Sequence, residues 1–204
     1  MNSTNKIALI TGGSRGVGRD IALRLAEKGI DVVLTYHTQR EAADQVAEAI
    51  REKGRHAAVF QLDTRDVSRF AGFRTELENY LKSSGYQTLD FLINNAGTAL
   101  YGRIGEITEQ QLDEVVGIHF KGVFFLTQQL LPLISEGGGI VNISSGLTRL
   151  TFPGSSVYAS VKTAVETFTR YLAKELGDRR IRANVVAPGA IATPLNRHLY
   201  TPEV

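Results

Sequence analysis

Short apolar runs rich in β-branched residues alternate along the chain with longer segments in which apolar residues recur every three or four positions. A short run of this kind is typical of a strand buried on both faces, and the longer pattern is typical of a helix with one apolar side. The predicted strands are Ile7–Thr11, Asp31–Tyr36, His56–Leu62, Asp90–Asn94, Ile140–Ser144 and Ile181–Ala187. The predicted helices are Val17–Lys28, Gln39–Lys53, Asp66–Lys82, Thr108–Val116, His119–Ile134 and Ser156–Leu176, with Gly137–Gly139 predicted as a turn.

The alternation predicts an α/β protein built on a doubly wound parallel sheet, the Rossmann fold, in three layers. Strands that are almost continuously apolar need helices on both faces, which is why the sheet is expected to lie in the middle layer. A length of 204 residues suits one domain, residues 1–204. Six such units in this order are typical of nucleotide-binding domains.

A glycine-rich loop, Thr11-Gly12-Gly13-Ser14-Arg15-Gly16-Val17-Gly18, joins the first strand to the first helix. Glycine allows the sharp turn, lets bare backbone approach a pyrophosphate and lets the helix pack closely on the sheet. The start of the helix then offers unpaired N–H groups to phosphates. A connector without a ligand is the alternative, but the position of the loop at the first helix of a βαβ unit favours nucleotide binding.

Tyr158 and Lys162 lie four residues apart on a predicted helix and therefore share one face. A free tyrosine, with a pKa near ~10, is a poor base at neutral pH, and a neighbouring ammonium stabilises its phenolate. Tyr158 could then exchange a proton with an alcohol or a developing alkoxide. Ser145 follows the fifth strand and could hold the same substrate oxygen. The alternative is an amphipathic surface pair without a catalytic role.

Four motifs occur in one order: the glycine loop, Asn94-Asn95-Ala96-Gly97, the spacing from Ser145 to Tyr158-x-x-x-Lys162, and Pro188-Gly189. Together they resemble the short-chain dehydrogenase/reductase superfamily, from about Lys6 to Thr193. The resemblance implies that the cofactor is bound by Gly12, Ser14, Arg15, Gly16, Val17, Gly18, His37, Asp63, Thr64, Asn95, Ala96, Gly97, Tyr158, Lys162, Pro188, Gly189, Ile191 and Thr193. It implies Ser145, Tyr158, Lys162 and His119 as the catalytic group.

Within that set, the resemblance places Asp63 and Thr64 at the adenine, and Asn95-Ala96-Gly97 at the adenine ribose. It places the segment from Pro188 to Thr193 at the nicotinamide, with the Lys162 ammonium on the nicotinamide ribose. Ordinary loop chemistry is the alternative for two of these features: Asp63 could cap the next helix, and Pro188-Gly189 could form a turn.

The sequence departs from the family pattern at two places. Many members carry asparagine at the position of His119, where it supports a water-linked proton path to the lysine. An imidazole that donates and accepts could serve there, or His119 could be a packed histidine without a catalytic role. Family members also usually continue beyond this chain with a substrate-covering helix, a further helix and a last strand. We therefore expect an incomplete substrate lid and an open edge at the sixth strand.

The cofactor is predicted to be NADP(H). NAD-binding domains carry an acid at the end of the second strand, but here that strand runs into His37, with no acid. Arg15, together with His37 or Arg40, could pair with a 2′-phosphate. The predicted activity is hydride transfer between this cofactor and a small-molecule carbonyl or secondary alcohol. The alternative is a catalytically weak NADP(H)-binding module with a regulatory or assembly role.

The substrate walls are expected in residues 98–104, 146–155 and 190–204. They contain Leu100, Tyr101, Leu147, Leu150, Phe152 and Leu195, with Arg103 and Arg149 nearby. This lining suits an apolar or aromatic carbonyl, and the two arginines would suit an acidic tail on it.

The composition limits the other kinds of ligand and partner that the protein could have. The chain has no cysteine, its four histidines show no metal-ligand spacing, and its formal net charge is only +2. We therefore expect no disulfide, no metal and no nucleic-acid partner. No signal peptide and no stretch long enough to cross a membrane is visible, so a cytoplasmic protein is expected. The long helices His119–Ile134 and Ser156–Leu176 resemble those through which the family pairs subunits, which predicts a homodimer or homotetramer.

Overall fold

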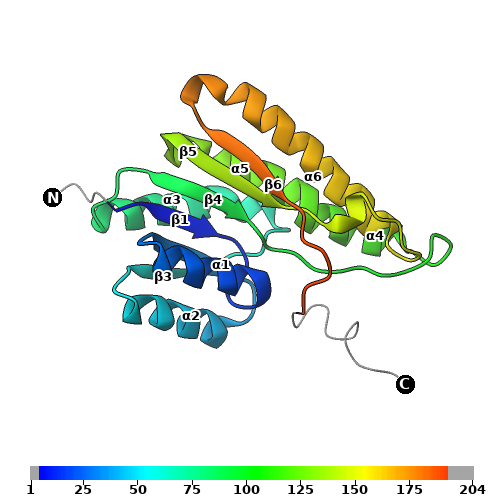
Figure 1. The fold of residues 1–204 in the computed structure, drawn as a ribbon, viewed down its shortest axis with the longest axis horizontal. Coiled ribbons are helices and arrows are strands. Elements are labelled where there is room, and N and C mark those ends of the chain that lie inside the picture. Colours follow the sequence, from blue (N-terminus) through cyan, green and yellow to red (C-terminus); the bar gives the residue numbers. More distant parts are fainter. Residues whose placement is uncertain (1–4, 193–204) are drawn as a thin grey trace.

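Six parallel strands form one sheet in the computed structural model, which describes residues 5–192. The strands are β1 (Ile7–Ile10), β2 (Asp31–Tyr36), β3 (Ala57–Gln61), β4 (Leu89–Asn94), β5 (Ile134–Ile143) and β6 (Arg182–Val186). Their order across the sheet is β3-β2-β1-β4-β5-β6 (Figure 1). The order reverses beside β1, which leaves a crevice at the carboxyl ends of β1 and β4, where doubly wound sheets bind their ligands.

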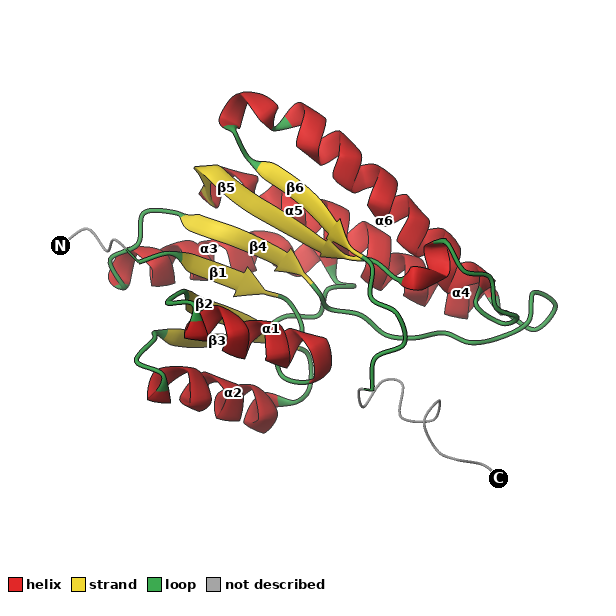
Figure 2. Cartoon of the chain, viewed as in Figure 1, coloured by secondary structure: helices red, strands yellow, loops and turns green. Residues whose placement is uncertain are grey.

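Helices cover both faces of the sheet, as the sequence predicts (Figure 2). They are α1 (Gly16–Glu27), α2 (Arg40–Glu52), α3 (Phe70–Ser83), α4 (Glu109–Val116), α5 (Gly122–Leu130) and α6 (Ser156–Glu175). Helices α1 and α2 pack on one face, and α3, α5 and α6 pack on the other. The three-layer Rossmann fold is thereby confirmed.

The alternation of side chains along β1 explains why both faces need a cover. Ile7 and Leu9 join the apolar cluster under α3, α5 and α6, whereas Ala8 and Ile10 join the cluster under α1 and α2. All four residues of β1 are fully buried. Successive side chains of a strand point to opposite faces, so each face removes apolar surface from water at roughly 25 cal/mol per Å².

The face of the sheet that carries α1 and α2 is covered only in part. In Figure 2 no helix lies over β5 and β6 on that side within the described residues. Strand β6 pairs only with β5 there, and Val186 at its end is half exposed. The sixth strand is thus an open edge in the part of the chain that the structure describes. None of the helices in residues 5–192 is long and apolar enough to cross a membrane.

Two boundaries differ from the prediction. The turn predicted at Gly137–Gly139 is wrong, because β5 runs through these residues. Gly137 takes a positive φ of 73°, and the pairing of β4 with β5 shifts register beside it, so glycine lets the strand continue through an irregularity. The helix predicted to run to Ile134 ends at Leu130, since Pro132 follows, and Ile134 begins β5.

The predicted break before His119 is also absent. A π-helical segment, Gly117–Lys121, joins α4 to α5 without a loop. Single π turns inside helices are frequent at functional sites. Gly122 follows this segment and packs against the carbonyl oxygen of Thr64, in the loop after β3, where a Cβ would collide with backbone. The position of the π segment therefore depends on that contact.

We predict that Gly122→Ala destabilises the fold by about 2 kcal/mol or more, because backbone must shift to admit the methyl group. Gly72→Ala in α3 is the matched control, since a Cβ at that helical position meets nothing within 4 Å. The control should stabilise by about 0.5–1 kcal/mol, the usual gain for this change inside a helix. Urea unfolding of both variants checks this, and equal stability of the two would contradict it.

Candidate active site

One cavity of about 770 Å³ lies at the carboxyl ends of the strands. Of the residues predicted for the site, its wall contains Gly12, Ser14, Arg15, Gly16, Val17, Gly18, His37, Asp63, Thr64, Asn95, Ala96, Gly97, His119, Ser145, Tyr158, Lys162, Pro188, Gly189 and Ile191. Thr193 lies outside the described residues. Segments that are far apart in the sequence thus meet at one place, where the sheet reverses its order.

The glycine loop forms one end of the cavity. Gly12 and Gly16 take positive φ values of 66° and 56°. Residues that carry a side chain rarely adopt these backbone angles. A Cβ on Gly18 would collide with the Gly12 carbonyl oxygen and the Asn95 amide. Helix α1 begins after Arg15 with no side-chain cap and no acid in its first turn. Its first N–H groups therefore face the cavity side without an internal anion, a geometry that fits a pyrophosphate.

Asn95 ties this loop to β4. Its side-chain amide donates to the carbonyl oxygens of Thr11, at 2.9 Å, and Gly12, at 3.1 Å. In return, the backbone N–H groups of Asn95 and Ala96 both donate to Thr11 Oγ1 at 3.0 Å. These four bonds cross from the end of β1 to the end of β4 and fix the floor of the crevice.

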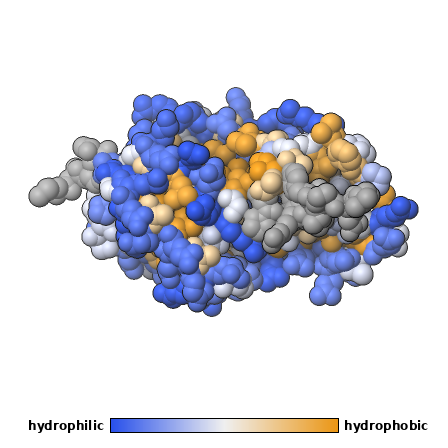
Figure 3. Space-filling view, turned by 60° about the horizontal axis from the view of Figure 1, so that its bottom comes forward, coloured by the Kyte–Doolittle hydropathy of each residue, from blue (hydrophilic) through white to orange (hydrophobic). Residues whose placement is uncertain are grey.

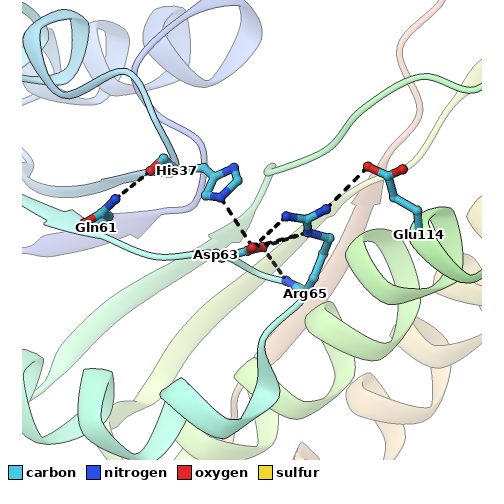
Figure 4. Close-up of polar contacts among 5 residues, drawn as sticks. All are labelled: His37, Gln61, Asp63, Arg65 and Glu114. Carbon is cyan, nitrogen blue, oxygen red and sulfur yellow. Dashed lines mark hydrogen bonds and ion pairs between the residues drawn. The ribbon is translucent and has the colours of Figure 1, made fainter.

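Charged side chains gather beyond the ends of β2 and β3 (Figure 4). His37 Nε2 lies 3.3 Å from Asp63 Oδ2, and Arg65 binds the same carboxylate with Nη2 at 2.9 Å. Arg65 Nη1 also lies 3.6 Å from Glu114 on α4. The hydrogen bond from Arg65 lowers the pKa of Asp63 below its usual value, with His37 contributing weakly. Sequence reasoning missed Arg65 and Glu114, although Arg65 directly follows the predicted Asp63-Thr64 pair.

The sequence left His37 and Arg40 as alternatives for a second cation beside Arg15, and the structure places them differently. His37 lines the cavity, whereas Arg40 is absent from its wall. Arg40 pairs instead with Asp44, one turn along α2, at 3.5 Å.

The end of the cavity that carries the predicted catalytic residues is built from α6 and the loop after β5. Lys162 is buried, and its ammonium donates to the Ile143 carbonyl oxygen at 2.7 Å. The same nitrogen lies 5.6 Å from the centre of the Tyr158 ring. Ser145 precedes the 3₁₀ turn Gly146–Thr148, and its Oγ accepts from the Leu147 N–H at 3.2 Å.

Burial governs the protonation of both residues on α6. It raises the pKa of Tyr158 to about 12, with a further contribution from Tyr101, and it lowers the pKa of Lys162 to about 8. The sequence predicts that the lysine favours the phenolate. In the structure the ammonium donates to the Ile143 carbonyl oxygen, and burial favours the protonated phenol.

Glu166, which sequence reasoning also missed, anchors the loop that carries Ser145. Its Oε1 accepts from Ser144 Oγ at 2.8 Å and from Thr148 Oγ1 at 2.9 Å. These two donors flank Ser145 in sequence, and Glu166 lies one turn after Lys162 on α6. The carboxylate therefore joins the serine loop to the helix of Tyr158 and Lys162. The sequence around Glu166 contains no motif that indicates this contact with the serine loop.

His119 is buried inside the π-helical segment. Its Nε2 lies 2.9 Å from the Thr98 carbonyl oxygen, and its ring meets the Tyr158 ring edge-on at 5.2 Å between centres. Nδ1 is buried without a hydrogen-bond partner among the described residues. A Cβ on Gly97 would lie 2.5 Å from the imidazole, so this glycine makes room for the ring. Burial, and then the Lys162 charge, hold the pKa of His119 well below its usual value.

Apolar side chains form the outer part of the same cavity. Tyr101, Leu147, Leu150 and Phe152 line it, as the sequence predicts. Leu150 and Phe152 are 58% and 57% exposed, although both are large and apolar. The wall of the cavity does not include Leu100, which was predicted to line it, or the nearby Arg103 and Arg149. Leu195 lies outside the described residues. Figure 3 shows apolar areas on an otherwise largely hydrophilic face of the molecule.

The geometry agrees with a known family. The family model for short chain dehydrogenases matches residues 6–203. This chain belongs to the short-chain dehydrogenase family. Versicolorin reductase 1 of Aspergillus parasiticus is 37% identical over 191 residues, which are 93% of this chain and 71% of that protein.

Solved structures of short-chain dehydrogenases superpose closely. One from Burkholderia cenocepacia in complex with NADP has a TM-score of 0.88 and 36% identity, and the match covers 96% of this chain and 78% of that one. The landomycin C-6 ketoreductase LanV, with bound NADP and rabelomycin, has a TM-score of 0.88 and 38% identity, with 93% and 78% covered. The resemblance seen in the sequence motifs is confirmed.

We predict that His119 stays neutral from pH 8 to pH 5.5, because burial and the Lys162 charge both disfavour the imidazolium. Two-dimensional NMR of the histidine ring nitrogens checks this, because the His119 ring signals should not move over this range. A His119 signal that shifts between pH 8 and pH 5.5 would contradict the neutral imidazole.

Proposed function

We propose that this short-chain dehydrogenase is an NADP(H)-dependent oxidoreductase that interconverts a carbonyl and a secondary alcohol, with Tyr158 as its acid and base. The observation that carries the proposal is that Ser145, Tyr158 and Lys162 line the same cavity as the glycine loop. One cavity can therefore hold a dinucleotide at one end and a reacting carbonyl at the other.

The residues present fit a nicotinamide cofactor. The uncapped start of α1 and the glycines that leave no space for a Cβ suit a pyrophosphate. Arg15 and His37 line the cavity where a 2′-phosphate would extend beyond β2. Two solved relatives contain NADP, which supports the same preference here. The bound cofactor would supply the hydride, and the chain supplies position, electrostatics and the proton.

The proton chemistry favours reduction. A phenol with a pKa of about 12 remains protonated at neutral pH and can donate its proton to the oxygen of a carbonyl under attack. Ser145 would hold that oxygen beside the phenol. Lys162, still cationic at pH 7, would bind the nicotinamide ribose and attract the developing charge. His119 would support the proton path as a neutral ring rather than as a titrating relay.

The outer cavity supports an apolar or aromatic carbonyl substrate. Exposed Leu150 and Phe152, with Tyr101 opposite the charged end, offer apolar surface that a flat hydrophobic ligand would cover. The absence of Arg103 and Arg149 from the wall removes the reason to expect an acidic tail. LanV, a ketoreductase solved with rabelomycin, supports the reduction of a ketone.

A homodimer or homotetramer remains part of the proposal. Phe125 on α5 and Tyr171 on α6 are 36% and 63% exposed, and both are large enough to seal a contact between copies.

We predict that Tyr158→Phe lowers the rate of ketone reduction at least about a hundredfold while NADPH binding is retained, because only the proton donor is lost. Stopped-flow absorbance of NADPH with a panel of apolar ketones and quinones measures the rate, and fluorescence titration measures the affinity. Tyr171→Phe, on the exposed side of the same helix, is the matched control.

Three outcomes would count against the proposal. Retention of more than a few per cent of the rate in Tyr158→Phe would assign the proton to another group. Tight NADPH binding without reduction of any carbonyl in the wild type would favour the binding module. Failure of the wild type to bind NADPH would contradict both the oxidoreductase and the binding module.

We predict that NADPH affinity falls as the pH rises through about 8, where buried Lys162 loses its charge. The ammonium is present below that pH and attracts the anionic cofactor, whereas the neutral amine above it does not. Fluorescence titration from pH 7 to pH 9.5 measures the effect. Lys162→Met should bind weakly with no step near pH 8, and Lys174→Met, exposed on the same helix, should behave as wild type. Constant wild-type affinity across this range would contradict the role of Lys162.

A further inference from the structure

Tyr158, Lys162 and Glu166 are spaced four residues apart on α6, so their side chains lie along one face of the helix. The first two belong to the Tyr-x-x-x-Lys motif, and the third lies outside it. We infer that Glu166 is a positioning residue for the proposed reaction: it fixes the place of Ser145 relative to Tyr158 by holding the hydroxyl groups on either side of Ser145. The inference rests on the proposed reduction of a carbonyl.

Two hydroxyl groups of the serine loop end on one oxygen of Glu166. Ser144 Oγ donates to Oε1 at 2.8 Å, and Thr148 Oγ1 donates to the same atom at 2.9 Å. Ser144 is only 3% exposed, so water cannot easily replace the carboxylate as its partner. A second acceptor, the Lys162 carbonyl oxygen, lies farther from Ser144 Oγ, at 3.5 Å. Because a buried hydroxyl without a partner costs free energy, the loop is held against Glu166.

The same contacts close the turn that carries Ser145. Thr148 Oγ1 also donates to the Ser145 carbonyl oxygen at 2.9 Å, so its hydrogen is shared between that oxygen and Glu166. The Thr148 N–H donates to the Ser145 carbonyl oxygen as well, at 3.1 Å. Within the turn, Ser145 Oγ accepts from the Leu147 N–H at 3.2 Å. Because Oγ is the acceptor in that bond, its own hydrogen can be donated to a substrate oxygen.

Backbone hydrogen bonds hold the other side of the loop. The Ser144 N–H donates to the Val186 carbonyl oxygen of β6, and the Gly146 N–H donates to the Pro188 carbonyl oxygen, both at 2.7 Å. These bonds tie the loop to the sheet, whereas Glu166 ties it to α6, the helix that carries the phenol. The proposed reaction needs the serine hydroxyl and the phenol at one substrate oxygen, and a misplacement of about 1 Å can cost a hundredfold in rate.

Glu166→Met tests the inference, because it removes the accepting oxygen and keeps the length of the side chain. The probe is whichever of two aromatic ketones, acetophenone or tetralone, the wild type reduces faster with NADPH. We expect the single-turnover rate to fall at least about tenfold, while NADPH affinity, measured by fluorescence titration, stays unchanged. Glu166→Gln keeps an oxygen that can accept both bonds and should recover to within about threefold of the wild-type rate. Glu175→Met, the same change at an exposed position of α6, should match wild type.

The Ser145→Ala background separates positioning of the serine from general support of the site. If Glu166 acts through Ser145, Glu166→Met should lower the rate of Ser145→Ala less than about twofold, because both changes then remove one effect. Tyr158 remains as the proton donor in this background, so product formation over long single turnovers stays measurable. Should Glu166→Met not fold, Thr148→Val removes one of the two donors and should show the same pattern.

Four results would overturn the inference: a wild-type rate in Glu166→Met, an equal loss in the Ser145→Ala background, loss of NADPH binding in the folded variant, or a rate of Glu166→Gln as low as that of Glu166→Met. Failure of the wild type to reduce either ketone would instead defeat the proposed reduction of aromatic ketones, and the inference with it.

Discussion

The hydrogen bonds between Thr11 and Asn95 hold together everything that the cavity needs. They join the ends of β1 and β4, the two strands at which the sheet reverses its order. The glycine loop begins on one side of this link, and the segment that packs on His119 begins on the other. Loss of the link would separate the end of the cavity formed by the glycine loop from the end that carries Ser145, Tyr158 and Lys162. The cavity therefore depends first on the reversal of strand order beside β1, which brings these segments together.

Burial, more than neighbouring charge, governs the protonation of the side chains proposed as catalytic. Tyr158 and His119 are both kept neutral, and Lys162 is the nearby cation with a pKa lowered by its surroundings. Its ammonium is satisfied by the Ile143 carbonyl oxygen. Such a centre holds a proton ready on the phenol and gains electrostatic strength from the low polarity around it. The charged network of His37, Asp63, Arg65 and Glu114 lies at the other end, where the cavity would meet the adenosine half of a dinucleotide.

The sequence was sufficient for the order of strands and helices and for most residues of the cavity wall, because apolar periodicity and glycine spacing act locally. It failed where a long-range contact decides. The π-helical segment at His119 depends on Gly122 packing against Thr64, more than fifty residues away. Glu166 and Glu114 read as ordinary helix-surface acids, and only folding shows that they anchor the serine loop and Arg65. The prediction of a turn at Gly137–Gly139 was wrong because glycines at an irregularity inside a strand have the same local pattern as glycines in a turn.

We propose that this cavity passes a hydride from NADPH to a carbonyl carbon while the protein supplies the proton. Mass spectrometry of the alcohol formed from an apolar ketone, with NADPH deuterated at the transferring carbon, tests it most directly. Each NADPH consumed should place one deuterium on the carbinol carbon of the alcohol, and none should remain on its oxygen after exchange with water. NADPH that is bound but not oxidised by any ketone, or alcohol formed without deuterium, would contradict it.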